Sequence, residues 1–240
     1  IVAQFFPNDK CFGSLLAQEI VSIKKVLEVG EKPVLAILGG AKVSSKITII
    51  ENILDKVDHL IIGGGMAFTF IKAQGGHIGK SICEDDKMPL ALSILEQAKA
   101  LGVQVHLTVD VRGGQDFSND TPQQVFPINE IPNDWEGMDA GPLSEAKFDA
   151  VVKQSKTILW NGPLGVFEME KFANGTIELG NSIAKATKNG AFSLVGGGDS
   201  VAAVKQFGFQ DKVSYVSTGG GAMLESLEGK DLPGIAALRD

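Results

Sequence analysis

The sequence predicts an α/β fold, with a doubly wound parallel sheet of about six strands and helices on both faces. Short continuous apolar runs recur along the chain, and such runs are typical of strands that are covered on both faces. Segments with helical apolar spacing lie between the runs, so strand and helix alternate as in right-handed βαβ units. Most of the runs also end in glycine, which indicates the edge of the sheet where a ligand binds.

The expected strands are the apolar runs at residues 34–38, 60–62, 103–109, 158–160, 192–195 and 213–216. The expected helices are residues 14–27, 45–56, 90–101, 172–186 and 201–207, whose apolar residues recur at helical spacing. Residues 112–143 are rich in glycine and proline, so we expect a long irregular excursion with a short β pair. The sequence contains no repeat and no low-complexity linker, so this pattern predicts one Rossmann-like domain.

Composition excludes several classes of protein. Of the 240 residues, 44% are apolar and 21% charged, as in soluble globular proteins, and none of the apolar runs approaches the length of a membrane span. The net charge is −7 and no stripe of Lys and Arg occurs, so we expect no nucleic-acid partner and no membrane partner. Two cysteines without metal-ligand spacing and the lack of a signal peptide favour a cytoplasmic location. The chain opens without Met in the middle of an apolar pattern, which suggests a fragment of a longer protein.

Five of the apolar runs end in a glycine cluster or a Gly-Pro turn. These junctions are Gly39-Gly40, Gly63-Gly64-Gly65, Asn161-Gly162-Pro163, Gly196-Gly197-Gly198-Asp199 and Ser217-Thr218-Gly219-Gly220-Gly221. Parallel sheets bind ligands beyond the carboxyl ends of their strands, and glycine lets backbone N–H groups approach an anion closely. The sequence therefore predicts a sheet edge built to hold phosphates.

Two lysines follow the first junction. Lys42 and Lys46 are four residues apart, hence on one face of a helix, where they would repel each other and oppose the helix dipole. A bound polyphosphate would relieve both effects, and this is the interpretation that the upstream glycines favour. The alternative is a pair of solvated surface lysines.

Polar residues at the other junctions also have two interpretations. Asp199 is either the N-cap of a helix or a ligand of Mg²⁺ on a nucleotide phosphate, and Ser200 offers its hydroxyl and N–H to phosphate. Asn161 can donate an amide N–H to a phosphoryl group. Glu168 can hold ribose hydroxyls, unless it is an early-turn helix carboxylate.

The second glycine cluster offers a floor for a purine. Gly63-Gly64-Gly65 is flat enough for a base to lie against, although a tight turn with close packing would need the same residues. Ile82 and Leu107 are candidate walls of that pocket, and each could instead belong to the core.

Taken together, these motifs resemble one family. Residues 38–46, 62–67, 160–168, 196–199 and 217–234 occur in the order found in the carboxy-terminal half of phosphoglycerate kinase, and the resemblance runs from about Phe12 to Leu238. It implies that residues 12–240 form the nucleotide-binding domain with the start of the interdomain helix, and that residues 1–11 are a remnant of the amino-terminal substrate domain. That absent domain is rich in Arg, which accounts for the presence of only Arg112 and Arg239 here.

The resemblance also implies an activity. The family transfers a phosphoryl group between 1,3-bisphosphoglycerate and ADP, giving 3-phosphoglycerate and Mg-ATP in glycolysis. We expect the whole enzyme to be a monomer, and this chain alone to bind Mg²⁺ with ADP or ATP but to turn over little, because in-line transfer needs both substrates positioned.

The resemblance to this family also implies a role for each site residue. Lys42 contacts the transferring phosphoryl group, with Gly197 and Gly220 beside it, and Lys46 contacts the inner phosphates. Asn161, Gly198 and Ser200 face the phosphate chain, Asp199 binds Mg²⁺ and Glu168 binds the ribose. The adenosine pocket is lined by Gly39, Gly64, Gly65, Ile82, Leu107 and Pro163.

The sequence departs from the family at three places: Ser45 replaces a frequent Asp, Thr108 replaces a common Pro, and residues 139–144 vary a loop that usually reads Asp-Ile-Gly-Pro. Two other function classes stay open. The first is a nucleotide-binding module without enzymatic activity. The second is a nicotinamide-dependent dehydrogenase domain, which the lack of GxGxxG and the lysine pair argue against.

Overall fold

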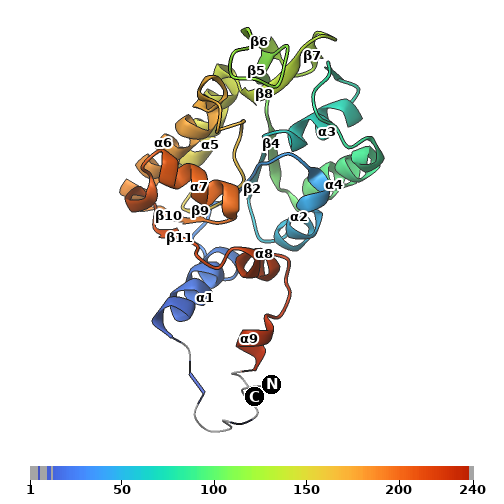
Figure 1. The fold of residues 1–240 in the computed structure, drawn as a ribbon. Coiled ribbons are helices and arrows are strands. Elements are labelled where there is room, and N and C mark those ends of the chain that lie inside the picture. The colour runs from blue at the N-terminus through green and yellow to red at the C-terminus, as the bar shows by residue number, and fades with distance from the viewer. Residues whose placement is uncertain (1–4, 6–9, 12, 238–240) are drawn as a thin grey trace.

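A parallel sheet of six strands forms the centre of the computed structural model, which describes residues 5, 10, 11 and 13–237 (Figure 1). The strand order is β11-β10-β9-β1-β2-β4, and every neighbouring pair is parallel. The strands are β1 (Val34–Leu38), β2 (His59–Ile62), β4 (Gln104–Leu107), β9 (Thr157–Asn161), β10 (Phe192–Val195) and β11 (Tyr215–Val216). The predicted fold class and the six strand positions are thereby confirmed.

The strands end level with one another. Leu38 lies opposite both Ile62 and Asn161, and Ile62 lies opposite Leu107. Because the strands are parallel, the loops that follow them emerge at one edge of the sheet. The register therefore places the glycine junctions side by side.

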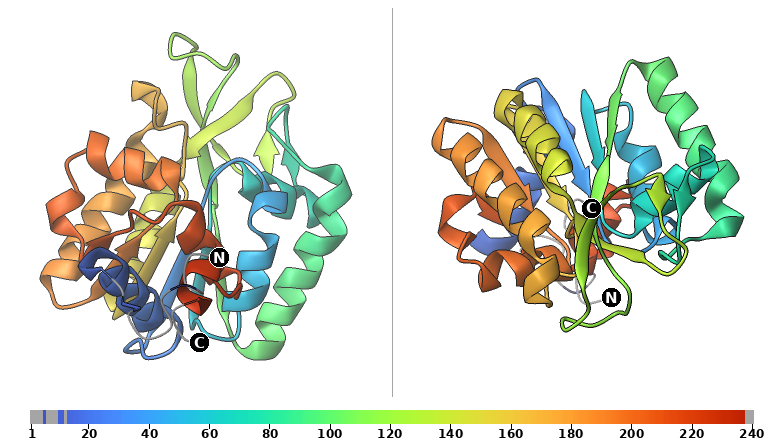
Figure 2. Two further views of the ribbon diagram at one scale, coloured as in Figure 1. Left: turned by 60° about the horizontal axis from the view of Figure 1, so that its bottom comes forward. Right: turned by 90° about the horizontal axis from the view of Figure 1, so that it is seen from above.

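Helices cover both faces of this sheet. Figure 2 shows α2 (Ile47–Ile53), α3 (Met66–Ala73) and α4 (Met88–Leu101) on one side, and α5 (Pro142–Gln154) and α6 (Asn174–Lys188) on the other. Alternate residues of β1 enter different cores, with Ala36 and Leu38 in one and Leu35 and Ile37 in the other. All five β1 residues are buried, as expected for a strand covered on both faces.

Three helices lie near the two ends of the described chain. Helix α1 (Ser14–Leu27) has the predicted bounds and packs against α8 (Gly221–Leu227), while α9 (Pro233–Ala236) follows α8. Glu19 of α1 accepts a hydrogen bond from the Tyr215 hydroxyl at 2.7 Å and another from Ser217. These bonds fix α1 to the end of β11.

The expectation for residues 112–143 was largely wrong. This segment contains most of an antiparallel sheet of three strands, β5 (Asp110–Gly114), β6 (Gln123–Pro127) and β8 (Glu136–Ala140). A further strand, β7 (Glu130–Ile131), pairs with β3 (His77–Ile78). The glycines that suggested a loop are packing positions, because a Cβ on Gly113 would lie 3.2 Å from the Phe126 ring.

The helix expected at residues 45–56 is shorter and broken. A 3-10 turn over Val43–Ser45 precedes α2, and Lys42 has extended backbone angles. Lys42 and Lys46 therefore do not share one face of an α-helix. Helix α3 was not predicted because six of its eight residues are buried, which leaves no polar face to reveal helical spacing.

Helix α7 (Gly198–Gln206) begins at the fourth glycine junction. The prediction that residues 1–11 are a remnant of another domain concerns positions that lie mainly outside the described residues. Among the described residues, no helix combines the length and the apolar character that crossing a membrane would require.

Candidate functional site

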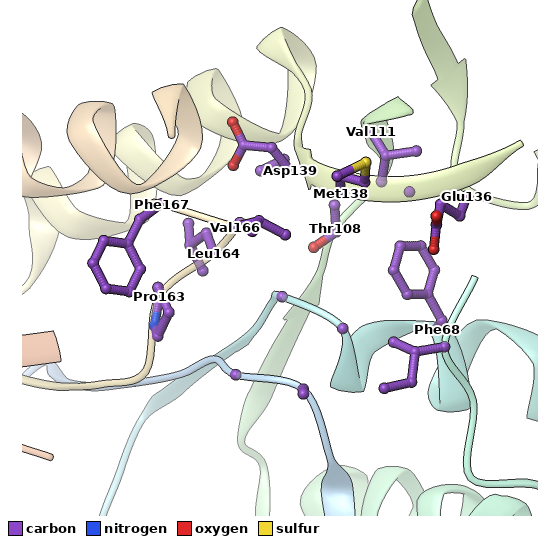
Figure 3. Close-up of a pocket in the computed structure, with 18 of the residues that line it drawn as sticks. Phe68, Thr108, Val111, Glu136, Met138, Asp139, Pro163, Leu164, Val166 and Phe167 are labelled. Carbon is purple, nitrogen blue, oxygen red and sulfur yellow. The ribbon is translucent and has the colours of Figure 1, made fainter. Parts of the chain in front are cut away.

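A cavity of about 390 Å³ opens at the carboxyl edge of the parallel sheet; we call it the edge cavity (Figure 3). Its lining comes from the loops after four strands, namely β1, β2, β4 and β9, and from α3, β5, β8 and the start of α7. These segments contribute Gly40, Ala41, Gly64, Gly65, Phe68, Thr108, Val111, Met138, Asp139, residues 163–168 and Asp199. The cavity lies where parallel α/β sheets bind ligands.

Glycines form the floor of the edge cavity through direct backbone contact between loops. Gly39 N donates to Asn161 O at 2.9 Å, and Gly40 N donates to Pro163 O at 3.0 Å. A Cβ on Gly39 would lie 2.1 Å from Pro163 O, so only glycine fits there. Gly64 has φ +64°, and its Cβ would lie 2.8 Å from Gly40 N. The part of the floor that a ligand can approach is therefore bare backbone at Gly40, Gly64 and Gly65, whereas Gly39, predicted to line the adenosine pocket, is buried and does not line the cavity.

Lys46 and Asn161 are brought together although 115 residues separate them in sequence. The Lys46 ammonium donates to Asn161 Oδ1, and Asn161 Nδ2 donates to Gly196 O at 2.7 Å. Asn161 is fully buried, so its amide holds the lysine in place at the junction of β9 and β10. Whether it also contacts phosphate stays a prediction.

The charge at this end of the cavity is partly buried. Burial lowers the pKa of the Lys46 ammonium, and the nearby Asp199 carboxylate opposes that shift. An anionic ligand would act in the same direction as Asp199, because it favours the charged form of the lysine. Neither Lys46 nor Lys42 is among the residues that line the edge cavity. Lys46 is half-buried and interacts with Asp199, which does line the cavity, whereas Lys42 is exposed.

Asp199 is not the N-cap of α7. It is the second residue of that helix, and the N-cap is Gly197, whose φ is +91°. Its side chain is exposed and lines the edge cavity beside Lys46. Ser200 is fully buried and accepts a hydrogen bond from Gly162 N at 2.5 Å, which fixes the turn after β9.

Glu168 is not the early-turn helix carboxylate that one interpretation predicted. It lies at the mouth of the edge cavity, exposed, in a turn that precedes a 3-10 segment over Glu170–Phe172, and so is not in the first turn of a helix. The helix-dipole interpretation of Glu168 is therefore wrong, and its contact with ribose hydroxyls stays a prediction.

Gly197, Gly198 and Gly220 surround a separate depression of about 370 Å³ at the ends of β10 and β11. Gly197 and Gly220 both have positive φ, which non-glycine residues rarely adopt. Of these glycines, none lines the edge cavity. Their assigned role beside the transferring phosphoryl group stays a prediction.

The apolar end of the edge cavity was predicted only in part. Ile82 lines it, whereas Leu107 packs against the core and borders a neighbouring depression instead. Since successive side chains of a strand point to opposite faces, the next residue, Thr108, enters the edge cavity in its place. Phe68 and Met138 are further wall residues that sequence reasoning missed, because they belong to α3 and β8.

Asp139 is a buried carboxyl in the cavity wall. It is 3% exposed, its Oδ2 accepts a hydrogen bond from Gly175 N at 2.8 Å, and that same oxygen lies 3.6 Å from the Arg112 guanidinium. Burial raises the pKa of Asp139 to about 8, against the opposing effects of Gly175 N–H and Arg112. We therefore expect the Asp139 carboxyl to titrate near pH 8.

A pH-dependent stability is expected from Asp139. Its folded-state pKa of about 8 exceeds the ordinary value of 3.8, so it stabilises the fold while protonated, and this contribution is lost as pH rises from about 4 through about 8. The difference in unfolding free energy between wild type and Asp139→Asn should change by about 1 kcal/mol per pH unit in this window. Asparagine does not titrate and keeps an acceptor for Gly175 N–H.

Urea unfolding at a series of pH values measures this difference, with Asp120→Asn as a control on an exposed carboxylate. The same pH slope in wild type and in Asp139→Asn would show that Asp139 does not titrate in this range.

The fold and the edge cavity define a doubly wound α/β protein with a candidate ligand site at the carboxyl edge of its sheet. Comparison with known proteins identifies the family to which the chain belongs. The sequence model of the family described as Phosphoglycerate kinase matches residues 1–230. The phosphoglycerate kinase of Porphyromonas gingivalis is 56% identical over 240 residues, which cover 100% of this chain and 57% of that protein.

Solved structures agree. The phosphoglycerate kinase of Coxiella burnetii has a TM-score of 0.91 and 46% identity, over 95% of this chain and 58% of the other. That of Pyrococcus horikoshii OT3 has a TM-score of 0.80 and 29% identity, over 95% and 56%. The chain belongs to the phosphoglycerate kinase family, and it spans somewhat more than half the length of these relatives.

Proposed function

We propose that this chain is the nucleotide-binding half of a phosphoglycerate kinase and holds Mg²⁺ with ADP or ATP across the edge of its sheet. Family membership supports the activity, and one observation supports the location: the partly buried Lys46 ammonium, held by Asn161, stands at the end of a bare glycine floor. In this proposal the nucleotide phosphates lie between Lys46 and the start of α7, and the nucleoside lies over Gly40 and Gly64.

The chemistry is a direct transfer. An oxygen of the ADP β-phosphate attacks the acyl phosphate of 1,3-bisphosphoglycerate, the bond between phosphorus and the carboxyl oxygen breaks, and 3-phosphoglycerate leaves as a carboxylate. No side chain needs to form a bond, so positioning and charge stabilisation supply the catalysis. Lys46 neutralises phosphate charge, and Lys42, exposed near the same edge, is proposed to reach the transferring group.

Magnesium fits the residues at this site. Within the described residues no cluster of three His, Cys, Asp or Glu could hold a metal, so the protein offers single carboxylates. Mg²⁺ commonly uses one or two carboxylates together with substrate phosphates, and the exposed Asp199 lies where those phosphates are proposed. When bound, the ion would neutralise charge on the phosphate oxygens.

Asp199→Asn tests the metal role and the proposed function together. Wild type should bind ADP more tightly with Mg²⁺ than with EDTA in calorimetric titrations, and the substitution should remove most of that difference while leaving EDTA values within about threefold, because it removes only the carboxylate that would hold the ion. Asp120→Asn, on an exposed loop, is the control. Lack of ADP binding by wild type would contradict the proposed function, and an unchanged Mg²⁺ effect would contradict the role of Asp199.

The proposal also covers the whole enzyme. We expect a monomer that works in glycolysis in the cytoplasm, with the substrate domain supplying the binding site for 1,3-bisphosphoglycerate or 3-phosphoglycerate. Adding a separately produced amino-terminal domain to this chain should restore turnover. Nucleotide binding without turnover in that mixture would favour a binding module without enzymatic activity.

A further inference from the structure

The hydroxyl of Thr108 is buried without a hydrogen-bond partner among the described residues. Thr108 is 3% exposed, and its Oγ1 is one of two buried side-chain polar atoms there without a partner. Figure 3 shows Thr108 in the middle of the edge cavity wall, between Leu164 and Phe68, with its oxygen toward the open space. Burying a hydroxyl without a partner is unfavourable, so a ligand that pairs with it gains affinity.

The other unpaired atom does not compete for this role. Asp139 Oδ1 would lie 2.0 Å from a Cβ on Gly165 and 2.5 Å from one on Gly175, so it packs against backbone. Its carboxylate points away from Thr108 in Figure 3. The Lys147 ammonium near Thr108 donates to Leu107 O at 3.1 Å. The half-buried Glu136 also lines the cavity, beside Phe68. Among the described residues, Thr108 is therefore the buried polar group without a partner that faces the cavity.

The order of the strands separates a charged end from an apolar end. Asn161 ends β9 and carries Lys46, and three strand spacings away, across β1 and β2, Thr108 follows β4. At about 4.8 Å for each spacing, the two ends are about 14 Å apart, which suits an extended nucleoside diphosphate. Phosphates at Lys46 therefore direct the base toward Thr108.

We infer that the Thr108 hydroxyl forms a hydrogen bond with the purine base of the bound nucleotide and so helps to determine which base is accepted. This inference rests on the proposed function. Val111, Leu164 and Phe68 form an apolar wall around Thr108 that suits a ring face, and the Glu136 carboxyl lies beside Phe68. The Thr108 hydroxyl can pair with a base whose edge presents a suitable donor or acceptor. A base without one would leave the hydroxyl unpaired and would therefore bind more weakly.

The test compares wild type, Thr108→Val and Thr108→Ser. Valine has nearly the shape of threonine but no hydroxyl, and serine keeps the hydroxyl. Thr108→Val should bind MgADP about three- to tenfold more weakly, as expected for the loss of one hydrogen bond, and Thr108→Ser should bind within about twofold of wild type. Inorganic tripolyphosphate, which has no base, should bind all three proteins equally.

Thermal unfolding of the free proteins supplies a second readout. Because valine removes an unpaired buried hydroxyl, Thr108→Val should unfold at the same temperature as wild type or higher. A structural role for Thr108 would lower that temperature instead and would overturn the inference.

Other outcomes are equally decisive. Equal MgADP affinities of wild type and Thr108→Val, or parallel losses for MgADP and tripolyphosphate, would overturn the contact with the base while leaving the proposed function intact. Failure of wild type to bind either ligand would overturn both.

Discussion

Replacing Lys46 by methionine is expected to weaken MgADP binding about 10- to 100-fold, since hydrogen bonds to charged groups contribute about 1.5–3 kcal/mol. Two effects combine in this prediction. The variant loses the ammonium that is proposed to meet the phosphates, and it leaves Asn161 Oδ1 buried without its donor. Isothermal titration with MgADP measures the change.

A matched control separates the site from general charge loss. Lys99→Met removes a lysine from the exposed end of α4, away from the edge cavity, and should leave MgADP affinity unchanged. If Lys46→Met unfolds like wild type and binds MgADP within threefold of wild type, the phosphates do not lie at Lys46.

The central sheet could be predicted because its signal is local. A strand buried on both faces is a short apolar run, and the bounds of β1 and β10 match the runs at residues 34–38 and 192–195. Helix α3 gave no such signal, since burial of Met66–Ile71 removes the contrast between its faces. Strands β5 and β8 were missed because their glycines are packing positions, which resemble turns in a sequence.

The candidate site was predictable at the level of junctions and not of individual contacts. Parallel strands place their loops at one edge, so the sequence could place Asn161, Asp199 and the glycines near one another. It could not show that Lys46 is held by a residue 115 positions away, nor that Thr108 and not Leu107 faces the cavity. Those facts depend on side-chain direction and on strand order, and both are properties of the folded chain.

Gly39→Ala is expected to disrupt the floor of the edge cavity. Its Cβ would lie 2.1 Å from Pro163 O and 2.7 Å from Gly162 O, and neither backbone oxygen can turn aside as a flexible side chain would. The loops after β1 and β9 must separate, which also strains the bonds from Gly39 N to Asn161 O and from Gly40 N to Pro163 O. We expect a loss of about 1–3 kcal/mol in unfolding free energy.

The nucleotide affinity of Gly39→Ala should fall by at least tenfold even where the variant stays folded, because Asn161 moves with its loop and carries Lys46. Gly234→Ala is the control: no heavy atom lies within 4 Å of its Cβ, so alanine fits there without a clash. Urea unfolding and MgADP titration on both variants measure the two effects separately. Wild-type stability in Gly39→Ala would mean that the two loops yield readily. Wild-type affinity would mean that the contact between the loops after β1 and β9 does not position the phosphate site. If it did, displacement of Asn161 would move Lys46 and weaken MgADP binding.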